Sequence, residues 1–279
     1  MSTAEGDGPV QVVAGVLVAP DGRVLIAERP AGRSFAGRWE FPGGKLHAGE
    51  TARAALDREL AEELGIAVER AEPLLAVTHR YPGAAAAVRI DCWRVRSWRG
   101  EPAGLDGQRF RWCPPATLAD ADLLEADRPI VTALRLPSHF APAAAARRQL
   151  NVPRGPVAWL AGAEAAAPPI AELGDLVCVV DPATPAAHCS VYTHAERFVP
   201  AADRRALAGL VVAGAAQAAA ATALGADFLL VPDTGLAAAE LAGIAAAGLP
   251  WYLDGAAAAA GVAPTGTLSW PGAAHLGDR

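Results

Sequence analysis

The stretch from Gly44 to Ile66 constrains what this chain can fold into more than any other part of the sequence. Residues 51–64 contain no proline or glycine and consist largely of strong helix formers, so they predict a helix. Gly65 follows as a residue suited to end that helix in a left-handed conformation. Three leucines recur at every fourth position and predict a buried stripe: Leu56, Leu60 and Leu64.

Four glutamates belong to the same stretch: Glu50, Glu59, Glu62 and Glu63. Residues spaced i, i+3 and i+4 share one helix face, and Glu50 lies just before the helix, within reach of that face. Carboxylates so close together repel one another, and a cation would relieve the repulsion. Hard oxygen ligands suit Mg²⁺ or Mn²⁺, particularly when substrate phosphates complete the shell. The alternative interpretation is a solvated acidic helix face. We expect Arg58 to orient a carboxylate rather than to contact substrate.

Length and charge limit the function classes. A chain of 279 residues suggests one large or two ordinary domains. The formal net charge of −6 provides no basic surface for nucleic acid. Residues 1–10 have neither a basic start nor an apolar run, which predicts no signal peptide and a cytoplasmic protein. The uncharged stretch 206–226 is weakly apolar and divides into strand-like and helix-like parts, so we expect no membrane span there. The sequence does not indicate an oligomeric state.

Strand and turn signals before and after the helix predict an α/β domain. Residues 10–19 and 23–28 are expected to form paired strands around the Asp21-Gly22 turn. Residues 39–41 predict a short strand that enters a glycine loop at Gly43 and Gly44. Further strands are expected at 74–79, 88–97 and 110–113, and a helix at 127–136. These elements predict an α/β/α sandwich with a mixed sheet.

The spacing of the central stretch resembles the Nudix box. Five residues separate Gly44 from Glu50, seven separate Glu50 from Arg58, and residues 58–66 read R-E-L-A-E-E-L-G-I. Residues 11–136 resemble the MutT branch of the Nudix hydrolases. The other matching segments are 12–15, Arg29, 38–45, 98–102, 107–108 and 126–129. The resemblance implies an enzyme that hydrolyses nucleoside triphosphates to monophosphates and pyrophosphate, with 8-oxo-dGTP as the best-known substrate of the branch.

The resemblance also implies roles for particular residues. The metal ligands would be Gly44 (through its carbonyl), Glu50, Glu59, Glu62 and Glu63, which would hold Mg²⁺, with Mn²⁺ as a substitute. The water molecule that attacks the substrate would be oriented or deprotonated by Glu59, Glu62 or Asp106. Asp106 stands where the family more often has glutamate, and a solvated turn residue is the alternative.

The implied substrate-binding residues are Arg29, Glu40, Phe41, Tyr81 and Asp127. Asp127 occupies a position where the family often has a base-reading asparagine, and a helix N-cap is its alternative. For Arg29 the alternative is a surface arginine, and for Tyr81 simple packing.

The C-terminal half predicts a second domain. Residues 137–153 are rich in proline and alanine and predict a linker between domains 1–136 and 154–279. Beyond it, strand-like pieces recur at 157–160, 176–180, 191–193, 210–212, 228–231 and 251–253, with alanine-rich stretches between the later ones. Residues 225–231 and 248–250 resemble late strands of the thiamine-phosphate synthase/TenI barrel. Since some 200 or more residues are typical of a full barrel, we expect a shortened TIM-type barrel without catalytic function.

The favoured hypothesis is therefore a Mg²⁺-dependent nucleoside triphosphate pyrophosphohydrolase that removes 8-oxo-dGTP. One alternative is a pyrophosphatase for CTP or dCTP. A second alternative is a non-catalytic nucleotide-binding module, which the retained glutamates disfavour. The expected partner is the nucleotide substrate, with neither nucleic acid nor membrane.

Overall fold

A computed structural model of the chain describes residues 8–136, 139–142, 157–161, 176–180, 188–192, 195, 200, 206–231, 235–254 and 264–268. The chain divides into two compact units, Met1–Ile130 and Val131–Arg279. The division falls within α2 (Arg128–Arg135), near the domain end that the sequence places at Leu136. The boundary at Leu136 itself stays a prediction.

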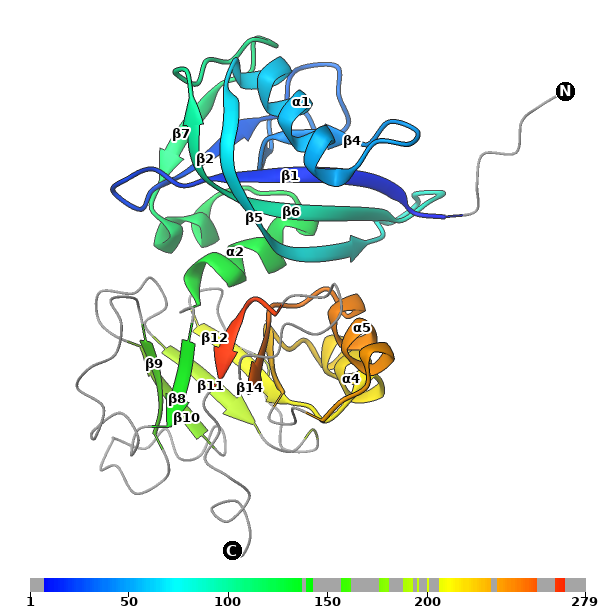
Figure 1. The fold of residues 1–279 in the computed structure, drawn as a ribbon, viewed down its shortest axis with the longest axis vertical. Coiled ribbons are helices and arrows are strands. Elements are labelled where there is room, and N and C mark those ends of the chain that lie inside the picture. Colours follow the sequence, from blue (N-terminus) through cyan, green and yellow to red (C-terminus); the bar gives the residue numbers. More distant parts are fainter. Residues whose placement is uncertain are drawn as a thin grey trace, which may run out of the picture. The chain divides into compact units, whose positions relative to one another are not determined.

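The first unit contains two sheets (Figure 1). The larger one has the order β4 (Gly43–Lys45), β1 (Val10–Leu17), β6 (Val88–Arg99) and β5 (Ala67–His79). In it β1 runs parallel to β6, whereas the other pairings are antiparallel. The smaller sheet is antiparallel, in the order β3 (Trp39–Glu40), β2 (Val24–Glu28) and β7 (Phe110–Cys113). The predicted α/β class with a mixed sheet is confirmed.

Two local predictions were wrong. The strands on either side of the Asp21-Gly22 turn do not form a hairpin, because β1 already has β4 and β6 on its two edges. Only the isolated bridge between Val18 and Val24 joins the two strands, and β2 continues into the smaller sheet. The predicted glycine loop is instead strand β4, in which Gly43 and Gly44 pair with Ala14 and Val13. A strand at this point holds the backbone more rigidly than a loop would.

Helix α1 (Ala52–Leu64) agrees with the predicted element, and the three predicted leucines are fully buried. They pack with residues of β1, β2 and β6 such as Val13, Leu25 and Val95. The glutamates lie on the neighbouring faces of the helix, where the Gly43 N–H of β4 donates to Glu63 and the Glu62 side chain is exposed to solvent. After β7, the 3-10 helices η1 (Pro115–Asp120) and η2 (Glu125–Asp127) lead into α2.

The second unit contains a ring of eight strands. In chain order they are β8 (His139–Pro142), β9 (Val157–Ala161), β10 (Leu176–Val180), β11 (His188–Tyr192), β12 (Ala206–Val211), β13 (Phe228–Val231), β14 (Trp251–Asp254) and β15 (Gly266–Leu268). The predicted linker 137–153 thus contains a strand of the ring, β8. Its residues 137–138 and 143–153 lie outside the described residues.

Pairing in this ring is parallel except on the two edges of β10, which are antiparallel to β9 and β11. Helices α4 (Ala215–Leu224) and α5 (Ala238–Ala246) follow β12 and β13 and lie side by side (Figure 1). The antiparallel pairings depart from the all-parallel TIM arrangement. The likeness to a shortened TIM-type barrel therefore stays a prediction. No helix in the described parts of the chain is long and apolar enough to span a membrane.

Candidate active site on helix α1

The two ends of α1 are capped by Thr51, which the sequence predicts as the first residue of the helix, and by Gly65, which it predicts as the residue that ends it. The Thr51 hydroxyl accepts a 3.2 Å hydrogen bond from the Ala54 N–H, which satisfies one of the free donors of the first turn. At the other end Gly65 adopts φ 69°, and its N–H donates to the Ala61 carbonyl at 3.1 Å. The caps determine where the helix begins and ends, and so fix the glutamate face relative to β4.

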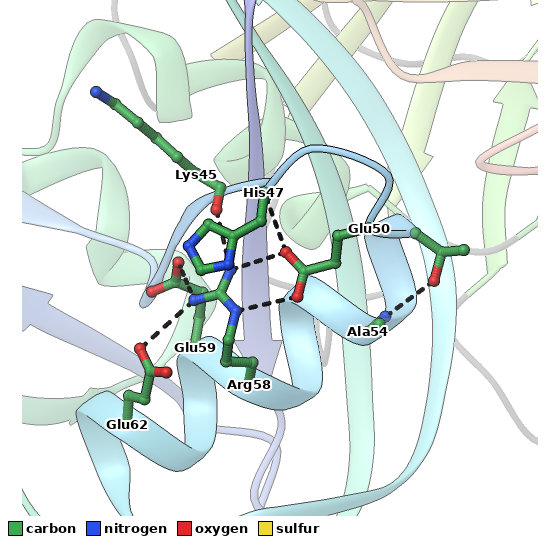
Figure 2. A network of polar contacts seen from close by, with 8 residues as sticks. Lys45, His47, Glu50, Ala54, Arg58, Glu59 and Glu62 are labelled. Carbon is green, nitrogen blue, oxygen red and sulfur yellow. Dashed lines mark hydrogen bonds and ion pairs between the residues drawn. The ribbon is translucent and has the colours of Figure 1, made fainter.

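Arg58 lies at the centre of the carboxylates (Figure 2). Its Nε and Nη2 donate to the two oxygens of Glu50 at 3.0 and 2.9 Å. Its Nη1 donates to Glu59 at 2.8 Å and to Glu62 at 3.4 Å. Nη2 also donates to the Lys45 carbonyl at 3.0 Å, which ties the helix to the end of β4. Arg58 holds carboxylates in place, as the sequence predicts.

The environment of Glu50 favours its charged form. Hydrogen bonds from Arg58 and from the His47 N–H, the latter at 2.9 Å, lower the pKa of Glu50 to about 2. Both favour the charged form of the carboxyl. Glu50 is thus ionised across the physiological range and available as an oxygen donor.

Glu63 has the opposite environment. Burial raises the pKa of Glu63 to about 8, against the lowering effect of a 3.0 Å hydrogen bond from the Gly43 N–H. The negative charges of Glu40, Glu59 and Asp106 add to the rise. Glu63 therefore senses three neighbouring negative charges, a repulsion that a bound cation would relieve.

Gly44 approaches Glu59 so closely that no side chain fits between them. A Cβ on Gly44 would lie 2.3 Å from the carboxyl carbon of Glu59. A Cβ on Gly43, which has φ 150°, would lie 2.1 Å from the Val13 carbonyl oxygen. Bare glycine backbone thus faces the glutamates on one side and β1 on the other, as expected where backbone must approach another group.

The loop that contains Asp106 is held against the C-terminus of α1. The Leu105 N–H and the Gln108 side-chain amide each donate to the Glu63 carbonyl at 3.0 Å, and the Ala103 N–H donates to the Leu64 carbonyl at 3.0 Å. The exposed Asp106 is close enough to raise the pKa of Glu63. The sequence does not indicate a role for Gln108. Its side chain caps a carbonyl of α1 that lies 45 residues earlier in the chain, and no local sequence pattern predicts such a contact.

The donor types fit a hard divalent cation, although the carboxylates do not converge in this conformation. Within the described residues, no three His, Cys, Asp or Glu side chains are gathered closely enough to hold a metal. The reason is visible in the contacts: Arg58 holds Glu50, Glu59 and Glu62, whereas the Gly43 N–H holds Glu63. The exposed Glu62 carboxylate is the one most free to turn, since its side chain is 61% exposed.

A second group of predicted residues lies around β3. Arg29 forms an ion pair with Glu40, and its Nε donates to the Ser34 carbonyl at 2.7 Å. Burial raises the pKa of Glu40, which the positive charge of Arg29 partly offsets. Phe41 follows as a buried residue. Arg29 is therefore held by its own loop and by β3 rather than free on the surface.

Asp127 is buried beside Phe41. The residue is 3% exposed, its carboxyl accepts a hydrogen bond from the Phe41 backbone, and Oδ2 has no partner among the described residues. Burial raises the pKa of Asp127 well above its usual value, and the charge of Glu40 adds to the rise. Burial raises the pKa of Tyr81 and the charge of Asp127 adds to the rise, so the two groups are near one another.

Tyr81 belongs to a small aromatic cluster. Its ring centroid lies 4.8 Å from that of Phe35 and 4.5 Å from that of His79. Phe35 is 43% exposed and has the unusual φ of 60° for a residue with a side chain. Nothing in the sequence singled out Phe35, because its apposition to Tyr81 depends on the fold of two distant loops.

The first unit is similar to known proteins of one family. The NUDIX domain family matches residues 13–133. The "Putative 8-oxo-dGTP diphosphatase 2" of Mycobacterium tuberculosis is 45% identical over 120 residues, which is 42% of this chain and 82% of that protein. The "CTP pyrophosphohydrolase" of Escherichia coli is 36% identical over 124 residues, 44% of this chain and 90% of that protein.

Among solved structures, the MutT structure described for Aliivibrio salmonicida and Vibrio cholerae is 33% identical. The match covers 45% of this chain and 96% of that one, with a TM-score of 0.39.

Proposed function

Because this chain belongs to the Nudix family, we propose that it is a Mg²⁺-dependent nucleoside triphosphate pyrophosphohydrolase that prefers 8-oxo-dGTP. The chain is a hydrolase of phosphoanhydride bonds. The proposed products are 8-oxo-dGMP and pyrophosphate, and the proposed role is the removal of an oxidised nucleotide from the free nucleotide pool of the cytoplasm.

The proposed metal ligands are the Gly44 carbonyl and the carboxylates of Glu50, Glu59, Glu62 and Glu63. When bound, Mg²⁺ would neutralise phosphate charge and lower the pKa of a coordinated water. Oxygen donors of both kinds suit that ion. The environment of Glu63 supports a cation there. Burial, with the neighbouring negative charges added, raises its pKa to about 8, so the carboxyl is mostly protonated near neutral pH and a positive neighbour would ionise it.

The chain's own residues would orient the attacking water. Glu59 lies against Gly44 and beside Arg58, so its carboxylate is fixed from two sides. Glu62 and Asp106 are more exposed and remain the alternative bases. A base must lie within hydrogen-bond reach of the water that it activates. The rigid position of Glu59 favours it for this role.

The preference for 8-oxo-dGTP rests on the buried Asp127. An ionised carboxylate only accepts hydrogen bonds, whereas a protonated carboxyl both donates and accepts. The raised pKa of Asp127 supports the protonated form. That form could accept the N7–H that oxidation creates and donate to the adjacent O6. Unoxidised dGTP has a bare N7 acceptor, which would leave a buried polar group unpaired at a cost of about 1–3 kcal/mol.

The remaining substrate contacts are proposed from their position around Asp127. Phe41 and Glu40 lie beside Asp127, and Arg29 supplies a positive charge next to Glu40. Tyr81 lies near Asp127 with its ring against Phe35, and this position supports the proposal that it stacks on the base.

A steady-state screen tests the proposal directly. Purified full-length protein would be assayed with Mg²⁺ on 8-oxo-dGTP, dGTP, CTP and dCTP, with release of pyrophosphate as the readout. We expect kcat/KM for 8-oxo-dGTP to exceed that for dGTP by roughly ten- to a hundredfold, the factor that corresponds to one unpaired buried polar group. Equal rates for the two guanine nucleotides would contradict the proposed base preference.

CTP or dCTP is the second candidate substrate. The similarity to a CTP pyrophosphohydrolase favours it, as does the ability of an ionised Asp127 to accept from the exocyclic amine of cytosine. In the same screen, a CTP rate above both guanine rates would support this candidate.

For the second unit we propose a degenerate, non-catalytic relative of the thiamine-phosphate synthase/TenI barrels. Seven strands of the ring pair in parallel in the order β11, β12, β13, β14, β15, β8 and β9, which supports a barrel of this kind. Loss of catalysis is supported at the N-terminus of α4, where the Glu240 carboxylate accepts from the Ala215 N–H at 2.7 Å. A carboxylate already occupies the place where a helix could bind a phosphate. Calorimetry with thiamine monophosphate tests this, and we expect no binding.

A further inference from the structure

We propose that Arg38 and Glu125 form a positioning pair that holds Asp127 against Phe41 and thereby sets the base preference of the enzyme. The inference rests on the proposed base-reading function of Asp127. We do not expect either member of the pair to contact the substrate, so neither is a catalytic residue.

The segment that leads to Asp127 is only weakly joined to the sheet. Trp39 in β3 pairs with β2 on one edge, and on the other it makes an isolated parallel bridge with Leu123. Two backbone hydrogen bonds form this bridge: the Trp39 N–H donates to the Asp122 carbonyl at 2.9 Å, and the Leu124 N–H donates to the Trp39 carbonyl at 3.0 Å. A one-residue bridge lacks the support of a continuous ladder, so its geometry depends on other contacts.

Arg38, the residue before Trp39, supplies such contacts. Its Nη1 donates to both oxygens of Glu125 at 2.9 and 2.8 Å. Its Nη2 donates to the Leu123 carbonyl, and its Nε lies 3.3 Å from the carboxylate of Asp122. One guanidinium thus donates hydrogen bonds to two residues of the segment 122–125, Glu125 and Leu123, and forms an ion pair with a third, Asp122. Its planar fork suits several acceptors at once.

The Arg38 contacts are more than a surface ion pair. The Arg38 side chain is 21% exposed and that of Glu125 38% exposed, so water screens them less than a fully exposed pair. The hydrogen bond from Arg38 also lowers the pKa of Glu125, which agrees with a favourable interaction in the folded state. Since Lys has a single ammonium group, it could not reproduce the three contacts.

The pair joins the two chain segments that contain Phe41 and Asp127. Arg38 precedes Phe41 by three residues in the chain, and Glu125 precedes Asp127 by two. The Phe41 backbone is hydrogen-bonded to the Asp127 carboxyl, so the contacts of Arg38 with Glu125 and of Phe41 with Asp127 join the same two segments. Loosening the first contact would let Asp127 move relative to Phe41. Base discrimination is sensitive to such movement, because a site group must be held within about 0.5 Å of its working position.

The segment should remain folded without the pair. Leu123, Leu124 and Ala126 are buried, with 7%, 7% and 2% exposure, so apolar burial also holds this segment. Removing the pair is therefore expected to loosen the position of Asp127 rather than to unfold the unit.

The test compares base preference in the full-length enzyme with Mg²⁺. The variants are Arg38→Ala, Glu125→Gln and the milder Arg38→Lys, each also made in the Asp127→Ala background. We define the preference as the ratio of kcat/KM for the best nucleotide of the screen to that for dGTP. We expect Arg38→Ala to reduce this ratio by about tenfold, mainly through KM, as a misplaced binding group does. Glu125→Gln and Arg38→Lys should reduce it less.

In the Asp127→Ala background, Arg38→Ala should change the ratio no further, because residues that act through one another are not additive. The matched control is Arg96→Ala, which breaks the 2.6 Å ion pair between Arg96 and Glu72 on β6 and β5. Thermal unfolding of every variant checks that it is folded at the assay temperature.

The outcomes separate the two proposals. A wild-type enzyme without any base preference would overturn the proposed base reading. A wild-type preference that survives Arg38→Ala and Glu125→Gln in folded protein would overturn only the positioning role. The same conclusion would follow if Arg38→Ala lowered the ratio equally with and without Asp127.

Discussion

The Glu59 carboxylate lies directly over the Cα of Gly44, so that a methyl group on Gly44 would come within 2.3 Å of its carboxyl carbon. Gly44 has no positive φ that would make alanine strained there. The requirement for glycine at this position is therefore one of space between β4 and α1, not of backbone conformation.

Gly44→Ala should displace the Glu59 side chain and disturb the proposed ligand set. We expect kcat with Mg²⁺ to fall by on the order of 10²-fold, the scale of losing a placed catalytic group. Gly8→Ala is the matched control, because a Cβ there meets no atom within 4 Å. Full activity of Gly44→Ala would show that Glu59 can leave this position without cost.

Glu62→Gln and Glu63→Gln keep the side-chain shape but remove a charge from the proposed metal face. We expect kcat to fall by roughly 10²-fold or more, about 3 kcal/mol in the barrier, with far-ultraviolet circular dichroism unchanged. Glu69→Gln is the control, since Glu69 lies past α1 and pairs with Arg99 at 3.4 Å. Near-normal turnover of both box variants would refute the assigned site.

The raised pKa of Glu63 predicts how stability depends on pH in metal-free protein. The folded state binds a proton at Glu63 up to a pKa of about 8, whereas the ordinary value is 4.5. Between these values the folded state carries more protons than the unfolded state, so its free energy of unfolding falls as pH rises. The free energy of unfolding, measured with urea in the presence of EDTA from pH 5 to 8, should fall along this slope. Glu63→Gln should make the slope shallower, whereas the control Glu69→Gln should leave it nearly unchanged. A slope unaffected by Glu63→Gln would place the responsible proton elsewhere.

A fragment of residues 1–136 should hydrolyse the same nucleotides as the full chain. It contains α1, the loop of Asp106, and Asp127, and its end lies close to the division after Ile130. We expect kcat/KM within about threefold of the full-length value, since domains generally have their own cores. A soluble, folded fragment that binds Mg²⁺ but has no activity would show that the second unit contributes to the site.

Asp127 tests the base preference itself. Asp127→Ala should narrow the ratio of kcat/KM between 8-oxo-dGTP and dGTP by about tenfold, because it removes the group that pairs with N7–H and O6. Asp127→Asn should largely preserve the ratio, since an amide also offers a donor and an acceptor. If the kcat/KM ratio of 8-oxo-dGTP to dGTP were lower in Asp127→Asn than in Asp127→Ala, the proposed role of a protonated carboxyl would be contradicted.

Local signals were sufficient to predict α1 and its glutamate face. Helix propensity, the i, i+4 leucines and the terminal Gly65 are short-range properties, so they can be recognised without knowing the rest of the fold. The same is true of Arg58, whose carboxylate partners lie on its own helix or just before it.

Only the tertiary structure determined which distant segments pair, contact one another or become buried. Sequence alone could not show that Gly43 and Gly44 belong to a strand rather than a loop, because their partners on β1 are about thirty residues away in the chain. Nor could it show that Arg38 contacts Glu125 across 87 residues, or that Asp127 becomes buried beside Phe41. Burial and pairing depend on which segments meet in space, and the resulting pKa of Asp127 depends on both. The amino-acid sequence by itself therefore determined the helix with its carboxylates, whereas the folded arrangement of β3, β4 and η2 determined how those carboxylates and the base-reading residues are held.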